Sequence, residues 1–169
     1  LLVVFVTRVT FMPLNMYWSL IFRDRSGEIW WFGILFAGII IFASFGNYLA
    51  GKVKPSQSIV SLVILSIGIL ILLSASTDIL YLYVGFFLLH EIGRGMLDPL
   101  IFTLWNRNGN IDNNERSTMN SIRSSAMTLG GSFGLVTFGV VADSFSTVTS
   151  WVIAGFILIA LSIYLQFKK

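Results

Sequence analysis

Hydrophobic residues in this sequence form six long blocks, which short polar stretches separate. A helix needs ~20 apolar residues to cross the hydrocarbon core of a bilayer, and the blocks are close to that length. None of them shows the strict alternation of apolar and polar positions that membrane strands require. The pattern predicts six membrane-spanning helices, at about residues 1–22, 29–50, 58–74, 79–105, 118–142 and 150–167.

The composition of the chain favours the bilayer as its solvent. Hydrophobic residues make up 56% of the 169 residues and charged residues only 11%, whereas soluble domains carry about a quarter charged residues. We therefore predict an all-α integral membrane protein with one six-helix domain. The absence of cysteine excludes disulfides and thiolate metal sites, and the formal charge of +3 is scattered. No metal, cofactor or nucleic-acid partner is expected.

The basic residues indicate an orientation in the membrane. One set of connectors holds only Arg23 and Arg25. The alternate connectors and the end of the chain hold a larger set, which consists of Lys52, Lys54, Arg107, Arg116, Lys168 and Lys169. By the positive-inside rule, the side with more basic residues is cytoplasmic. The sequence predicts a multi-pass protein of the cell (plasma or inner) membrane with a cytoplasmic C-terminus.

Polar side chains divide the predicted helices into two kinds. The third and sixth contain no ionisable residue and are interpreted as lipid-facing. The first, second, fourth and fifth carry polar residues, which should face protein or a water-filled cavity. The order inner, inner, outer occurs twice along the chain, and Phe45-Gly46 has a faint echo in Phe138-Gly139. This order favours two inverted three-helix repeats.

The fourth predicted helix contains FFLLHEIGRGMLDPL, residues 86–100, in which ionisable residues interrupt an apolar run. At about 100° per residue, Glu91, Arg94 and Asp98 lie within roughly 60° of one another on the helix. Arg94 is within reach of Glu91 at i−3 and of Asp98 at i+4. Two interpretations stay open. One is a structural ion pair, and the other is a substrate or proton-coupling site with Glu91 as the proton carrier and His90 at its edge.

The same stretch raises the question of an enzyme, because HEIGR begins like the zinc-protease motif His-Glu-x-x-His. That chemistry needs a second imidazole at position 94, where this chain has arginine, and His90 is the one histidine of the sequence. A metal-dependent hydrolase is therefore disfavoured, and no catalytic residue or metal ligand is predicted.

Further candidates lie on other helices. Arg8 and Asn15 share a face of the first helix, where Arg8 is either a cavity residue or the counter-ion of an acid elsewhere. Gly130 and Gly134 form a Gly-x-x-x-Gly pair, which favours close helix packing or a sliding contact during conformational change. The remaining residues predicted to serve packing or gating, through bending or close approach, are Pro13, Gly46 and Pro99.

Three stretches carry a resemblance to a known family: LLHEIGRGMLDPL, NNERSTMNSIRSSAMTLGGSFGLVTFGVVAD and GNYLAGKVK. Together they resemble the C-terminal six-helix half of a major facilitator superfamily transporter, over the whole chain. Glu115-Arg116 resembles the family's entry into a small-residue helix. The stretch with Lys52 and Lys54 resembles a degenerate form of its Gly-rich basic cytoplasmic loop, with Gly51 where the family has an acidic residue. The resemblance implies that an N-terminal half is missing from the sequence and acts as a partner.

This resemblance implies secondary active transport of a small-molecule substrate across a lipid bilayer by alternating access. The intramembrane ionisable residues favour proton coupling. The aromatic-rich faces and the resemblance suggest drug-like or amphipathic compounds as substrates. Efflux is one of the two directions of transport that stay open. The alternatives are a membrane scaffold or sensor without transport activity and, less favoured, a membrane-embedded enzyme.

Overall fold

Each apolar block forms one helix in the computed structural model, which describes residues 1–26, 30–108 and 116–167. The helices are α1 (Leu2–Ser26), α2 (Trp31–Ala50), α3 (Gln57–Ser76), α4 (Leu80–Asn108), α5 (Arg116–Ser144) and α6 (Thr147–Phe167). Several of them extend past the apolar blocks into polar flanks, because the backbone hydrogen-bond ladder continues into the interfacial region. The predicted start of the second helix at residue 29 lies outside the described residues, as do Glu115, Lys168 and Lys169.

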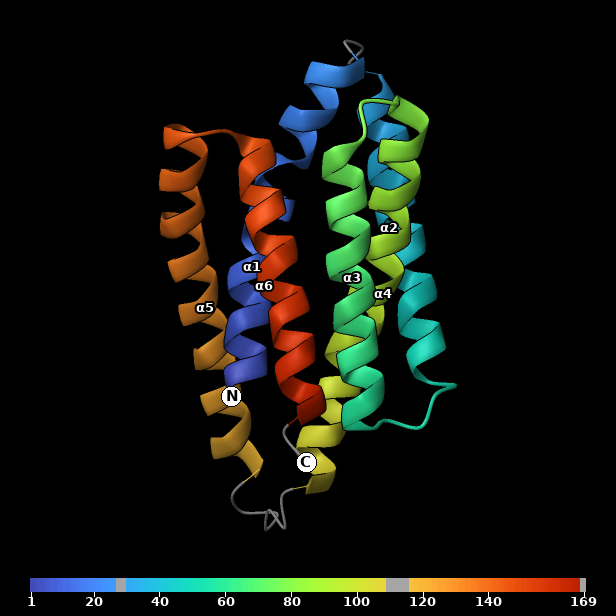
Figure 1. Cartoon of the computed structure of the whole chain (residues 1–169). Coiled ribbons are helices and arrows are strands. Elements are labelled where there is room, and N and C mark those ends of the chain that lie inside the picture. The colour runs from blue at the N-terminus through green and yellow to red at the C-terminus, as the bar shows by residue number, and fades with distance from the viewer. Residues whose placement is uncertain (27–29, 109–115, 168–169) are drawn as a thin grey trace.

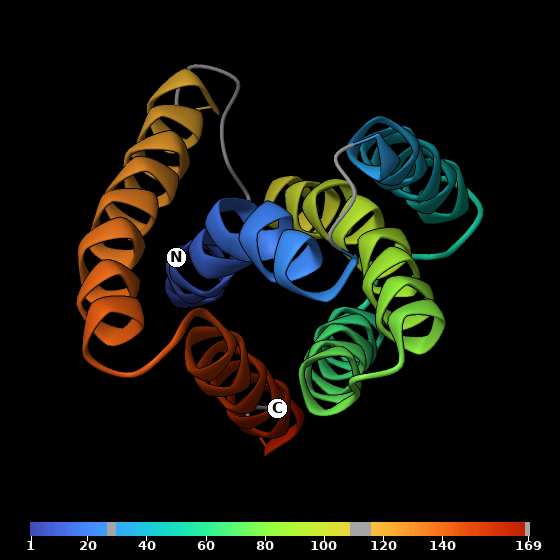
Figure 2. The ribbon, with the colours of Figure 1, turned by 90° about the horizontal axis from the view of Figure 1, so that it is seen from above.

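The helices run alternately up and down the bundle (Figure 1). Seen along its length, α5, α1, α4 and α2 follow one another in an arc, and α3 and α6 lie together on one side of that arc (Figure 2). The most extensive contacts are those of α3 with α6, α2 with α4, α1 with α5 and α3 with α4. Of the central helices, α1 contacts α5 and α6 and α4 contacts α2 and α3, whereas the contact between α1 and α4 themselves is small.

Small residues allow α3 and α6 to approach closely. Gly68 and Gly155 face each other, and a methyl group added at Gly68 would lie 2.9 Å from the carbonyl oxygen of Gly155. Two buried serines, Ser61 and Ser162, each donate a hydrogen bond of 2.9 Å to the backbone carbonyl of the other. Without a hydrophobic force between helices in lipid, such close packing and polar contacts hold helices together.

Glycines also set the spacing of α5 against α1 and of α2 against α4. A methyl group added at Gly130 or at Gly134 would lie 2.6 Å from a carbonyl oxygen of α1, that of Phe5 or of Val9 respectively. On the other side of the bundle, Gly46 of α2 packs directly against the backbone carbonyl of Ile92 in α4. Each of these positions admits only hydrogen, since any larger side chain would collide with backbone atoms.

The end of α3 is held by a residue of another helix. The guanidinium of Arg25 donates hydrogen bonds to the carbonyl oxygens of Ser74 and Ala75 at 3.2 and 3.4 Å, and it lies 4.5 Å from the centre of the Tyr83 ring. Carbonyl groups in the last turn of a helix have no partner within the helix. Arg25 therefore caps α3 with a positive charge, which the helix dipole favours.

Four helices, α2, α3, α5 and α6, are long and apolar enough to cross a membrane. The other two, α1 and α4, are as long but carry most of the ionisable residues within the helices. Length and composition therefore support four of the six predicted spans. They do not identify α1 and α4, because composition alone does not reveal a span whose charges pair inside the protein.

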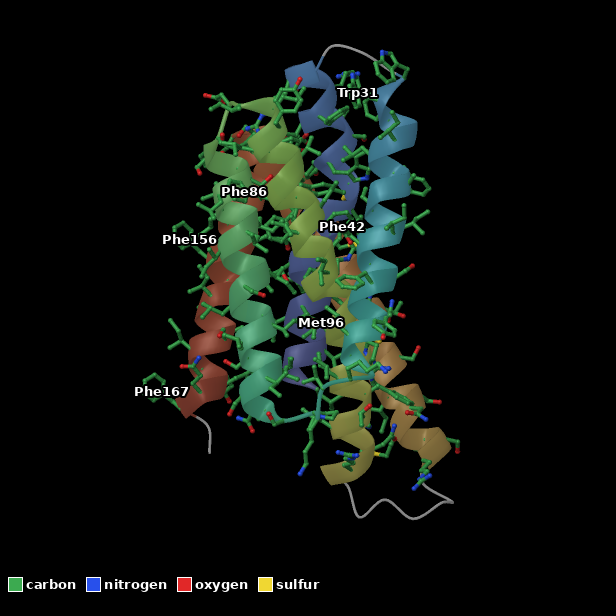
Figure 3. All side chains as sticks on the ribbon, turned by 90° about the vertical axis from the view of Figure 1, so that its right-hand side faces the viewer. Trp31, Phe42, Phe86, Met96, Phe156 and Phe167 are labelled. Atoms are coloured by element: carbon green, nitrogen blue, oxygen red, sulfur yellow. The ribbon has the colours of Figure 1, made fainter. Side chains whose placement is uncertain are left out.

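The third and sixth helices, which the sequence predicts to be lipid-facing, each bury one face and expose another. Ile64, Ile67 and Leu158 are fully buried on their inner faces. Phe156 and Phe167 point away from the bundle at 60% and 84% exposure (Figure 3). Of α2, α3, α5 and α6, the least buried helices are α2 and α5: 11% and 17% of their most apolar 18-residue segments are buried.

Candidate functional site

The ionisable residues of the predicted stripe lie on α4, in the middle of the arc of helices. Glu91 is 2% exposed, and its Oε1 accepts a hydrogen bond of 2.9 Å from a terminal nitrogen of Arg94. The Arg94 side chain is 27% exposed, so the pair extends from the core toward an open face. A charge-assisted hydrogen bond of this kind offsets part of the cost of removing the carboxylate from water.

His90 lies beside Glu91 and is fully buried. Its Nδ1 contacts the backbone carbonyl oxygen of Phe87, and a carbonyl only accepts, so Nδ1 carries the ring proton in the neutral imidazole. Its Nε2 lies 3.5 Å from Glu91 Oε1 and has no hydrogen-bond partner among the described residues. An unprotonated nitrogen therefore faces a carboxylate oxygen with room for a proton between them.

Asp98 is not paired with Arg94. Its Oδ2 lies 2.6 Å from a terminal nitrogen of Arg8 on α1, and its Oδ1 lies 3.9 Å from Arg123 on α5. Asp98 is 55% exposed, and the two arginines are 27% and 15% exposed. The predicted stripe thus divides into a buried Glu91–Arg94 pair and a three-residue cluster that joins α1, α4 and α5.

The structure therefore makes Arg8 the counter-ion of an acid on another helix, which was one of its two predicted roles. Arg123 was not among the predicted site residues. A signal for it exists in the sequence: Arg123 is seven residues before Gly130, which puts both on the same face of a helix at about 100° per residue. The face of α5 that packs on α1 therefore also carries its arginine.

The two groups differ in charge. Glu91 and Arg94 form a balanced pair, whereas the guanidiniums of Arg8 and Arg123 share the single carboxylate of Asp98. Like His90 Nε2, the buried Nε of Arg123 has no hydrogen-bond partner among the described residues. The cluster at Asp98 therefore has one more cationic side chain than acidic side chains.

The other predicted residues of α1 and α4 have separate positions. Asn15 is exposed, and Pro13 is buried inside α1. The carbonyl oxygen of Pro13 accepts a hydrogen bond of 3.0 Å from the indole nitrogen of Trp151, which ties α1 to α6. Pro99 lies inside α4, where its carbonyl oxygen accepts from the Thr103 hydroxyl at 2.8 Å. Neither proline ends its helix.

One aromatic ring of α1 lies beside Arg94, and further rings meet along α1 and α2. The guanidinium carbon of Arg94 is 5.6 Å from the centre of the Phe11 ring. Further along α1, Trp18 contacts Phe32 and Phe36 of α2, with ring centres 6.0 and 6.5 Å apart. Arginine beside aromatic rings forms a surface that accepts both charged and apolar groups.

The connector of α2 and α3 and the start of α5 lie at the same end of the bundle as the end of α6 (Figure 1). Lys52, Lys54 and Arg116 are exposed. The Lys52 ammonium lies 5.2 Å from the centre of the Tyr48 ring. Within residues 1–26, 30–108 and 116–167, no group of three His, Cys, Asp or Glu side chains has metal-binding geometry.

The sequence model of the Major Facilitator Superfamily matches residues 1–168. The chain belongs to this superfamily. The match confirms the resemblance found in the sequence, and it makes the chain a multi-pass membrane protein of a transporter family. Comparisons with curated proteins and with solved structures gave no match.

Proposed function

We propose that the chain is one six-helix half of a secondary transporter, which moves a small amphipathic molecule by alternating access and couples its movement to protons. The observation that carries the proposal is the position of Glu91. Its carboxylate is 2% exposed at the middle of α4, and its partner Arg94 reaches the open face of the bundle. An ionisable group at such a depth is costly, and in membrane proteins it usually serves a pathway for protons or substrate.

A second half is supported by the surfaces of α2 and α5. Large apolar side chains such as Phe36, Ile41 and Val136 are 54–70% exposed there. The outer face of α5 also carries hydroxyl groups around a surface hollow of about 610 Å³, lined by Ser121, Ser124, Ser125, Thr128 and Leu129. Hydroxyls on a membrane helix are better satisfied by protein or water than by lipid tails. We infer that this face meets the partner half or the aqueous path between the halves.

The contacts between helices support two inverted three-helix repeats. The contact of α1 with α5 corresponds to that of α4 with α2, and α3 pairs with its counterpart α6. Glycines lie at both corresponding contacts, Gly134 in one and Gly46 in the other. Exchange of the first three helices with the last three therefore leaves this set of contacts unchanged, as expected for inverted repeats around a central site.

In this mechanism Glu91 takes up a proton from water on one side of the membrane and releases it on the other. Protonation removes its negative charge, so the attraction between Glu91 and Arg94 weakens. Because α4 contacts α1, α2 and α3, a change at this pair reaches helices on both sides of the arc. Rocking of this half against its partner then alternates access to the site.

The test uses the intact transporter in liposomes that contain a pH-sensitive dye, with amphipathic compounds added on the outside. The wild-type protein should produce proton flux on addition of a transported compound, and it should accumulate that compound when a pH gradient is imposed. Glu91→Gln keeps the volume of the side chain, so it should fold and lose accumulation while downhill flux persists. Asp24→Asn, at an exposed position, is the matched control and should keep accumulation. Normal accumulation by Glu91→Gln would remove Glu91 from the mechanism.

A further inference from the structure

We propose that the site selects an anionic substrate, a small molecule with a carboxylate or phosphate on an apolar body, and that Arg94 is its ligand. This inference rests on the proposed transport function and specifies its substrate class. The argument begins with charge. One helical turn from the balanced Glu91–Arg94 pair, two arginines share the single carboxylate of Asp98, so a bound cation would add to this positive excess, whereas an anion would offset it.

The two acids differ in their capacity to hold a cationic substrate. Asp98 is the more exposed acid, but arginines from two other helices already surround its carboxylate. Glu91 is buried behind Arg94 and has almost no surface to offer. Each acid thus already has a cationic partner, which a bound amine would have to displace.

Arg94 has the opposite properties. It is 27% exposed, and Glu91 is the one acidic partner that it has among the described residues. A guanidinium has five N–H donors in a planar fork. The hydrogen bond to Glu91 uses one terminal nitrogen, and the remaining edge suits the two oxygens of a carboxylate or phosphate. The buried Phe11 ring, 5.6 Å from the guanidinium carbon, helps to hold the guanidinium in this orientation.

The neighbours of Glu91 make this affinity depend on its proton. The helices that pack on α4 contribute few other charges near it: α2 and α3 contain no Asp, Glu, Lys, Arg or His, and Arg8 of α1 is committed to Asp98. When Glu91 is ionised, it competes with the substrate for Arg94. When Glu91 is protonated, its hydroxyl can donate to the unpartnered Nε2 of His90, and Arg94 becomes free for the anion.

Proton and substrate therefore bind together. The proton that Glu91 accepts comes from the water that delivers the substrate, and it returns to water on the side where the substrate leaves. The apparent affinity for an anion should rise as the pH falls through the titration of Glu91, because protonation removes the competing carboxylate. In Glu91→Gln the competitor is permanently neutral, so affinity for the anion should become independent of pH.

The experiment measures equilibrium binding to the intact, purified transporter by titration calorimetry, without any gradient. The probes are benzoate and 2-naphthoate, each with its neutral amide and its arylmethylamine (benzylamine or 2-naphthylmethylamine), which is cationic at neutral pH. We expect binding of a carboxylate and no binding of the matched amide or amine. We also expect the double variant Glu91→Gln/Arg94→Gln, which strands no charge, to bind the carboxylate at least about tenfold more weakly than Glu91→Gln, the loss of one charge-assisted contact. Arg23→Gln, an exposed arginine of α1, is the control and should bind as the wild type does.

Tighter binding of an amine than of its carboxylate, absence of binding by both carboxylates, or equal carboxylate binding by the single and double variants would overturn the inference. These outcomes are separate from a failure of transport. Binding and proton flux with an amine would refute the anionic substrate and leave the proposed function standing. Binding of carboxylates without coupled proton flux would support the anionic substrate and refute the proposed proton-coupled transport.

Discussion

Asp98 of α4 and Arg8 of α1 lie 2.6 Å apart, although 90 residues separate them in the chain. Arg94 lies only one helical turn from Asp98 on the same helix and would be the nearer partner in sequence. The structure nevertheless pairs Asp98 across helices, where Arg123 of α5 joins it at 3.9 Å. This cluster is a polar contact that joins both central helices to α5.

The contribution of this pair to stability can be measured with a double-mutant cycle. For Asp98→Asn and Arg8→Gln we expect a coupling free energy of ~0.5–1 kcal/mol, a modest value because water screens the half-exposed carboxylate. The measurement is thermal unfolding of the two single variants and the double variant in detergent. The matched control is Arg23–Asp24, which is 3.7 Å apart with both side chains more than 60% exposed, and its coupling should be near zero. Equal coupling in the two cycles would contradict a structural role for the cluster.

Arg94→Ala should destabilise the protein by about 3 kcal/mol, because it leaves the buried Glu91 carboxylate without its partner. Glu91→Gln/Arg94→Met, which removes both charges and keeps similar volumes, should recover most of that loss. Unfolding midpoints and the fraction of monodisperse protein after extraction report both effects. Arg116→Ala serves as the control, since Arg116 is exposed at the start of α5. If the double variant is as unstable as Arg94→Ala, the loss comes from packing and not from a stranded charge.

Gly46→Ala should destabilise the contact of α2 with α4 by about 1–3 kcal/mol, because the added methyl group meets the Ile92 carbonyl and the helices must separate. The control is Gly85→Ala in α4, where a methyl group would meet nothing within 4 Å. That change should be neutral or slightly stabilising, since alanine has the higher helix propensity. Thermal unfolding of the two variants decides the matter, and similar midpoints would refute the close approach of the two backbones.

The predicted orientation can be tested by cysteine labelling, since the chain has no cysteine of its own. Lys54→Cys, in the connector of α2 and α3, should react with a membrane-impermeant maleimide only after the membrane is opened. Phe145→Cys, in the connector of α5 and α6, should react in intact cells. Both residues are exposed, so accessibility to the reagent depends on the side of the membrane. The reverse labelling pattern would invert the topology.

Much of this fold was readable from the sequence. The length of the apolar blocks indicates the six helices, because a helix that satisfies its own backbone is the favoured element in lipid. The i, i+3 spacing of Glu91 and Arg94 brings them within reach on one helix, which is where the structure pairs them. The short motifs also carried the family, which the match over residues 1–168 confirms.

Only the tertiary structure decided the contacts between helices. Spacing along one helix made Arg94 a candidate partner of Asp98, but Arg8 and Arg123 hold that carboxylate from α1 and α5. In the same way, the sequence shows that Gly46 is small, but not that the Ile92 carbonyl lies against it. The physical reason is that helical periodicity determines which residues share a face, whereas the packing of glycines and buried serines between helices determines which faces meet.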